Sequence, residues 1–64
     1  MKEFKEHDIV IASTDIKKRR LLIKKGTPGT IVHIYDEKNF EVEFMSGDDN
    51  IVETVTIDKI KKVK

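Results

Sequence analysis

The stretch that decides the fold reads Lys25-Gly26-Thr27-Pro28-Gly29-Thr30-Ile31-Val32-His33-Ile34-Tyr35. Pro28 presets its own φ, and Gly26 and Gly29 can take φ > 0 at no steric cost, so residues 26–29 predict a tight turn. The β-branched residues that follow predict a β-strand over residues 30–35. A turn that leads straight into such a strand is typical of a small all-β domain.

Strand signals continue on both sides of this stretch. Phe40, Val42 and Phe44 alternate with glutamates at 41 and 43, and this period of two predicts a strand with its aromatic face inward. Polar turns are expected at residues 36–39 and 46–50, and a single 3₁₀-like turn at residues 58–59. The remaining predicted strands cover residues 8–12, 51–57 and 60–63.

A long connection, residues 13–25, separates the first two predicted strands. Its apolar trio Leu21-Leu22-Ile23 needs burial, so we expect a bent hairpin arm that folds back on the sheet. A helix over residues 15–25, with Asp15 as its N-cap, is the competing interpretation.

Together these elements describe one all-β domain over residues 1–64, a small SH3-like barrel of about five antiparallel strands with a long first loop. Phe4 is expected to pack across one end of the barrel. The predicted core consists of Ile9, Ile11, Leu22, Ile31 or Val32, Ile34, Phe40, Val42, Phe44, Val55, Ile57 and Ile60.

Length and composition bear on metal sites, cofactors and membrane association. A chain of 64 residues buries only about 60% of its unfolded surface and, without cysteine, has neither disulfides nor a thiolate metal site. Two histidines alone cannot close a zinc site, so we expect no metal and no cofactor. The charged start of the chain has no apolar signal region, which predicts a cytoplasmic protein without membrane association. Charge is basic over residues 1–25, acidic over 36–53 and basic again over 58–64.

Four segments carry a resemblance to a known family: the stretch quoted first, and Phe4-Lys5-Glu6-His7-Asp8-Ile9-Val10, Phe40-Glu41-Val42-Glu43-Phe44 and Val55-Thr56-Ile57-Asp58-Lys59-Ile60. In order and spacing they resemble an uncharacterised family of small bacterial proteins over almost the whole chain. The resemblance implies an SH3-like barrel of unknown function and assigns no binding or catalytic residue. The turn and strand are also similar to KOW motifs of ribosomal and transcription proteins.

The chain departs from that family in its first loop, where relatives usually have a short segment bearing Pro or Glu. Here the loop is basic, and two further lysines follow it. Together these cations are the candidate nucleic-acid contacts Lys17, Lys18, Arg19, Arg20, Lys24 and Lys25. Such clusters neutralise phosphates and release counterions. A solvated loop that balances the acidic middle segment is the favoured alternative, since Tyr35 is the one aromatic expected to be free for base stacking.

The first functional hypothesis is a non-enzymatic protein-interaction barrel, because no nucleophile and base stand in a recognisable pattern. It would bind one protein partner, as an accessory subunit or an operon-partner binder, and an immunity or antitoxin protein is a subtype of this hypothesis. The sequence leaves the oligomeric state open. We expect the partner surface to include Leu22, Ile31, His33 and Tyr35.

Overall fold

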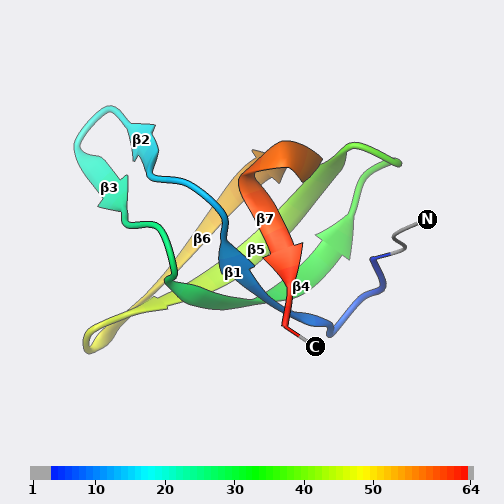
Figure 1. Cartoon of the computed structure of the whole chain (residues 1–64), viewed down its shortest axis with the longest axis horizontal. Coiled ribbons are helices and arrows are strands. Elements are labelled where there is room, and N and C mark those ends of the chain that lie inside the picture. Colours follow the sequence, from blue (N-terminus) through cyan, green and yellow to red (C-terminus); the bar gives the residue numbers. More distant parts are fainter. Residues whose placement is uncertain (1–3, 64) are drawn as a thin grey trace.

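Seven strands and one 3₁₀ turn are found in the computed structural model, which describes residues 4–63 (Figure 1). Five strands form an antiparallel sheet in the order β6-β5-β4-β1-β7, and β2 pairs with β3 as a separate hairpin. Their bounds are β1 Ile9–Ala12, β2 Ile16–Lys18, β3 Leu21–Ile23, β4 Pro28–Ile34, β5 Asn39–Ser46, β6 Asp49–Thr56, η1 Ile57–Lys59 and β7 Ile60–Lys62.

The all-β prediction is confirmed, and each of the five predicted strands corresponds to a strand of the sheet. The hairpin arm is also confirmed, with Ile16 paired to Ile23 and Lys18 to Leu21. The competing helix over residues 15–25 is wrong, because β2 and β3 pair as a hairpin that buries Ile16 and Ile23 on one side. The 3₁₀ turn occurs where it was predicted, one residue longer.

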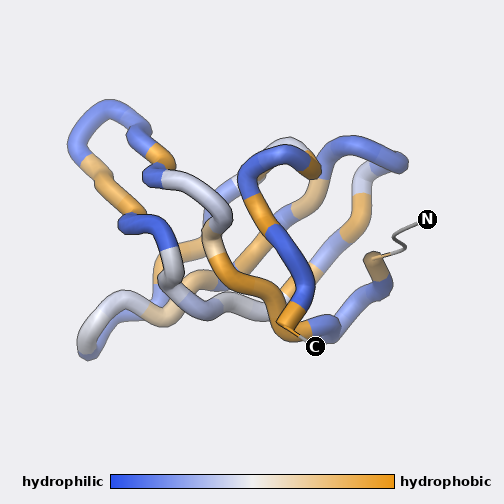
Figure 2. Tube along the Cα trace, viewed as in Figure 1, coloured by the Kyte–Doolittle hydropathy of each residue, from blue (hydrophilic) through white to orange (hydrophobic). Residues whose placement is uncertain are grey.

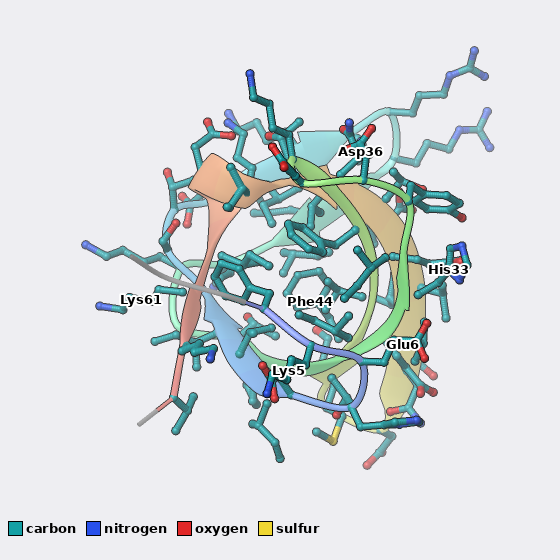
Figure 3. The ribbon with its side chains drawn as sticks, turned by 90° about the vertical axis from the view of Figure 1, so that its right-hand side faces the viewer. Lys5, Glu6, His33, Asp36, Phe44 and Lys61 are labelled. Carbon is teal, nitrogen blue, oxygen red and sulfur yellow. The ribbon has the colours of Figure 1, made fainter. Side chains whose placement is uncertain are left out.

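The sheet curls around a core in which Phe44 is central (Figure 3). The hairpin helps to cover this core with Ile16 and Ile23, and Phe4 packs on Phe40 with ring centroids 5.3 Å apart. The ten buried hydrophobic residues are Val10, Ala12, Ile16, Ile23, Ile31, Phe40, Val42, Phe44, Val55 and Ile60.

Two predicted core assignments are wrong, and both lie in runs that are apolar at every position. In β1, Val10 and Ala12 point inward and Ile9 is 52% exposed. In β3, Ile23 is buried and Leu22 is exposed. A run of apolar residues carries no alternation, so it does not reveal which face a strand buries. Elsewhere the predicted Ile11, Ile34 and Ile57 are partly buried rather than central.

A β-bulge in β4 changes which residues share a face. Ile31 pairs with Val42 and His33 pairs with Glu41, so Val32 is the extra residue between two consecutive pairs. Ile31 is therefore fully buried while His33 is exposed. The expectation that Ile31 shares the surface of His33 and Tyr35 is wrong, because the bulge breaks the alternation on which it rested.

Candidate functional site

The basic segment forms the tip of the β2–β3 hairpin. Lys17 and Lys18 end β2, and Arg19 and Arg20 make the two-residue turn before Leu21. Figure 2 shows a hydrophilic tip above two arms with apolar residues. Arg19 has a φ of 34°, a region that usually favours Gly, Asn or Asp, so turn geometry alone does not account for an arginine there.

The other two predicted cations lie at the base of the hairpin. Lys24 and Lys25 follow β3, and the Lys25 main-chain N–H donates to Asp15 Oδ1 at 2.8 Å. The six predicted nucleic-acid contacts are therefore divided between the tip and the base of the hairpin, and the structure does not bring them together as one patch.

One cation of the tip reaches the main sheet. Lys18 Nζ donates to the main-chain oxygen of Thr54 in β6 at 3.2 Å. Lys18 projects on the same side of β2 as Ile16, whose side chain enters the core. The hairpin is thus held over the β6 side of the sheet by apolar burial and by this bond.

A cleft of about 460 Å³ lies between β2, β6 and η1. Its apolar surface comes from Ile16 and Val55, which also belong to the core. Its polar lining combines three ammonium groups, two hydroxyls and one amide, from Lys17, Lys18, Lys59, Thr54, Thr56 and Asn39. A positively charged rim over an apolar floor suits an extended segment with acidic and aliphatic side chains.

One carboxylate stands next to this cleft. The Thr56 hydroxyl donates to Asp58 Oδ1, and this bond lowers the pKa of Asp58 below its usual value. Asp58 therefore remains ionised at neutral pH and engages the Thr56 hydroxyl. Three lysines against this one carboxylate leave the cleft with a positive charge.

Ammonium, hydroxyl, amide and aliphatic groups line the cleft. Among the described residues that line it there is no carboxylate, histidine or cysteine. Residues 4–63 contain no group of three or more His, Cys, Asp or Glu side chains placed to hold a metal ion. Over the same residues, no helix has the length and apolar character to cross a membrane.

A second polar group occupies the outer face of β4 and β5. The Tyr35 hydroxyl donates to Glu41 Oε1 at 2.9 Å, and the Tyr35 ring meets the His33 ring edge-on with centroids 4.6 Å apart. The bond to the Glu41 carboxylate raises the pKa of Tyr35, because ionisation would remove the donated proton and add a like charge. His33 Nδ1 lies 3.9 Å from Glu6 Oε2, and Figure 3 shows these two side chains on one side of the molecule.

The predicted partner surface is only partly assembled. His33 and Tyr35 are in contact on the outer face, whereas Leu22 lies on the hairpin opposite Lys17 and Ile31 is buried. Sequence reasoning missed Asn39, Thr54, Thr56 and Lys59 as residues of one cleft. Lys59 belongs to a basic segment that the sequence does show, but its proximity to the hairpin depends on the long-range packing of β2 against β6.

Comparison with known proteins places the chain in a family without assigning a role. Neither the curated proteins nor the solved structures include a match to this chain. A family model does match over residues 6–61, which is most of the chain. This match agrees with the resemblance drawn from the sequence. The chain belongs to the family described as "Domain of unknown function (DUF4926)".

Proposed function

We propose that this chain is a non-enzymatic protein-interaction module with an SH3-like barrel fold, and that it binds an acidic segment of a protein partner in the cleft beside the β2–β3 hairpin. The barrel assignment is supported by the strand order β6-β5-β4-β1-β7, the hairpin inserted between β1 and β4, and the 3₁₀ turn between β6 and β7.

The observation that carries the proposal is the lining of the cleft. Lys17 and Lys18 of β2 and Lys59 of η1 surround the apolar Ile16 and Val55. Charged rims determine partner choice and association rate, while apolar floors supply affinity. Carboxylates of a bound segment can therefore pair with the lysines while its aliphatic side chains cover the floor.

A direct test compares two variants with the same change in net charge. The tagged chain is purified from its native host as wild type, as Lys18→Glu/Lys59→Glu and as Lys24→Glu/Lys25→Glu. The first variant reverses charge inside the cleft, and the matched control reverses it at the base of the hairpin. We expect the protein that co-purifies with wild type to be lost from the cleft variant and kept by the control.

The proposal is wrong if the cleft variant, with an unchanged circular dichroism spectrum, retains that protein. A companion variant, Leu22→Asp/Tyr35→Asp, addresses the surface predicted from the sequence, since both side chains are exposed outside the cleft lining. Loss of the partner from this variant alone would move the binding surface to the outer face.

Nucleic acid is the second candidate ligand, favoured by the four consecutive cations at the hairpin tip and by Arg19 at a positive φ. Contacts to phosphates predict an affinity that falls steeply with salt, with a slope of log K against log salt of about −0.7 per phosphate on a single strand. A filter-binding or anisotropy titration with single-stranded RNA and DNA tests this. Absence of binding at low salt would dismiss it.

A further inference from the structure

The strand β6 forms one edge of the sheet. In the order β6-β5-β4-β1-β7, β5 pairs with one side of β6, and the residues described include no strand on its other side. Within an antiparallel strand, main-chain groups point alternately to either side. Ile57 N–H donates to Lys38 O on the β5 side, whereas Thr54 O accepts from Lys18 on the outer side. The outer edge of β6 therefore presents the N–H and C=O groups of Asn50 and Val52 and the N–H of Thr54, while the Thr54 oxygen accepts from Lys18.

This edge strand is longer than β7 at the other edge of the sheet, and its only charged residues are Asp49 and Glu53. Natural edge strands are kept short or carry Lys or Pro, as β7 does with three residues and two lysines. The strand β6 has eight residues, Asp49-Asn50-Ile51-Val52-Glu53-Thr54-Val55-Thr56, without Lys or Pro. Its Val52 is 47% exposed. Such a β-branched edge is suited to the addition of another strand.

The two ends of this edge have opposite charge. Asp48 and Asp49 lie at the turn where β6 begins. Near the other end, Thr54 and Thr56 lie in the cleft with Lys17, Lys18 and Lys59. A strand that is acidic at one end and basic at the other is complementary to an antiparallel copy of itself, because a two-fold axis places each end on its opposite.

We propose that a second copy of this chain is an occupant of the cleft. The β6 strands of two copies pair antiparallel, and Asp48 and Asp49 of each copy enter the basic cleft of the other. The inference rests on the proposed function in one respect, that the cleft accepts an acidic segment. It names that segment as the β5–β6 turn and adds the β6 edge as the backbone contact.

Charge also selects the register of the pair. With Val52 opposite Val52, Asn50 faces Thr54 and Asp48 faces Thr56 at the cleft, and Glu53 faces the apolar Ile51. A centre at Glu53 would oppose two glutamates, and a centre at Ile51 would oppose Glu53 to Asp49. Like charges directly opposite each other destabilise a strand pair, so the Val52-centred register is favoured.

The experiment uses sedimentation velocity and light scattering over a range of protein concentrations. The wild-type mass should rise with concentration from 7.4 kDa toward twice that value. Val52→Lys places two cations on the two-fold axis and should keep the chain monomeric. Val32→Lys is the control, because Val32 is exposed in β4, away from the β6 edge.

A charge exchange tests the contact between turn and cleft. Asp48→Lys/Asp49→Lys and Lys18→Glu/Lys59→Glu should each lose the dimer, since each opposes like charges. An equimolar mixture of the two variants should recover dimers, because the basic turn meets the acidic cleft and the acidic turn meets the basic cleft. Amide chemical-shift dispersion of each variant establishes that it is folded.

A wild-type chain that stays monomeric at millimolar concentration overturns the proposal, as does a mixture that fails to recover dimers. An acidic peptide then separates this failure from failure of the proposed function. If monomeric wild type or Val52→Lys binds the peptide in the cleft, the dimer is wrong and the proposed function stands. If the wild type dimerises and Lys18→Glu/Lys59→Glu dimerises equally well, the contact to the cleft is wrong.

Discussion

Lys18 Nζ lies 3.2 Å from the main-chain oxygen of Thr54 and donates a hydrogen bond to it. This bond joins the tip of the β2–β3 hairpin to the edge of β6, at the border of the basic cleft. It also places one cation where an incoming strand or acidic side chain would meet it. The position of the hairpin and the charge of the cleft are therefore coupled through one residue.

Lys18→Met should keep the apolar stem of this residue and remove the bond. Because Lys18 is exposed, we expect the free energy of unfolding to fall by no more than about 1 kcal/mol. Hydrogen exchange at residues 16–23 should nevertheless become faster, since the hairpin loses one attachment to β6. Unchanged exchange in this segment would show that apolar burial alone holds the hairpin.

Ile23→Ala and Leu22→Ala should differ sharply although the residues are adjacent. Ile23 is fully buried, and its truncation should cost about 2–5 kcal/mol through lost burial and a cavity. Leu22 is 44% exposed, and its truncation should change stability by about 0.5 kcal/mol or less. Urea unfolding of both variants checks this, and equal losses would contradict the observed hairpin register.

Gly29→Ala should destabilise the chain by overpacking. A Cβ at this position would lie 2.8 Å from Val42 Cγ1, 3.0 Å from Phe44 Cδ1 and 3.1 Å from the main-chain oxygen of Glu43. Forced shifts of this kind typically cost about 1–3 kcal/mol. Thermal unfolding should show a clear fall in the melting temperature for Gly29→Ala. The fall should be much smaller for Pro28→Ala, because the neighbouring Pro28 is exposed. A neutral Gly29→Ala would mean that β4 and β5 lie farther apart.

Asp36→Ala should weaken the β4–β5 turn in a pH-dependent way. Asp36 Oδ1 accepts from the main-chain N–H groups of Lys38 and Asn39, both at 2.8 Å, and these bonds lower its pKa. A lowered pKa contributes stability that is present above the unfolded value of about 3.9 and lost as pH falls through the folded value. Thermal melts from pH 7 to 2 should therefore converge for wild type and Asp36→Ala at the acid end.

The matched control is Glu37→Ala in the same turn. A difference in melting temperature between wild type and Asp36→Ala that stays constant down to pH 2 would contradict a stabilising role of the ionised carboxylate.

Tyr35 reports directly on its own environment, because it is the chain's single tyrosine. Its raised pKa, caused by the bond to Glu41, predicts ionisation above the usual value of about 10 in an ultraviolet titration. Because the pKa is raised in the folded chain, the bond between Tyr35 and Glu41 contributes stability that is present below about pH 10. This stability is lost as pH rises through the folded pKa. Glu41→Gln should move the titration back toward 10, and an unchanged midpoint would contradict the bond.

The alternating strand Phe40-Glu41-Val42-Glu43-Phe44 could be assigned from the sequence, because its period of two fits one structure. The turn predicted over residues 26–29 was placed too far along the chain: Gly26 has a φ of 90°, whereas Pro28 and Gly29 already belong to β4 and pair with β1. The exposed position of Ile9 and Leu22 could not be assigned from the sequence, since their neighbours are equally apolar. The bulge at Val32 left no trace in the sequence and reversed the face of Ile31.

The cleft could be predicted only in part. The cations of the hairpin are visible as a run from Lys17 to Arg20. Their meeting with Thr54 and Lys59 is a long-range contact, set by the packing of Ile16 and Ile23 into the core. No local pattern encodes such a contact.

A heteronuclear NMR titration of the labelled chain with an unstructured peptide rich in Asp and Glu tests whether the cleft binds an acidic segment. Its control is the same peptide with Asn and Gln in place of the acids. Binding in the cleft predicts amide shifts at Lys17, Thr54 and Lys59 for the acidic peptide and none for the control. No shifts with the acidic peptide, or shifts confined to His33 and Tyr35 on the outer face, would contradict it.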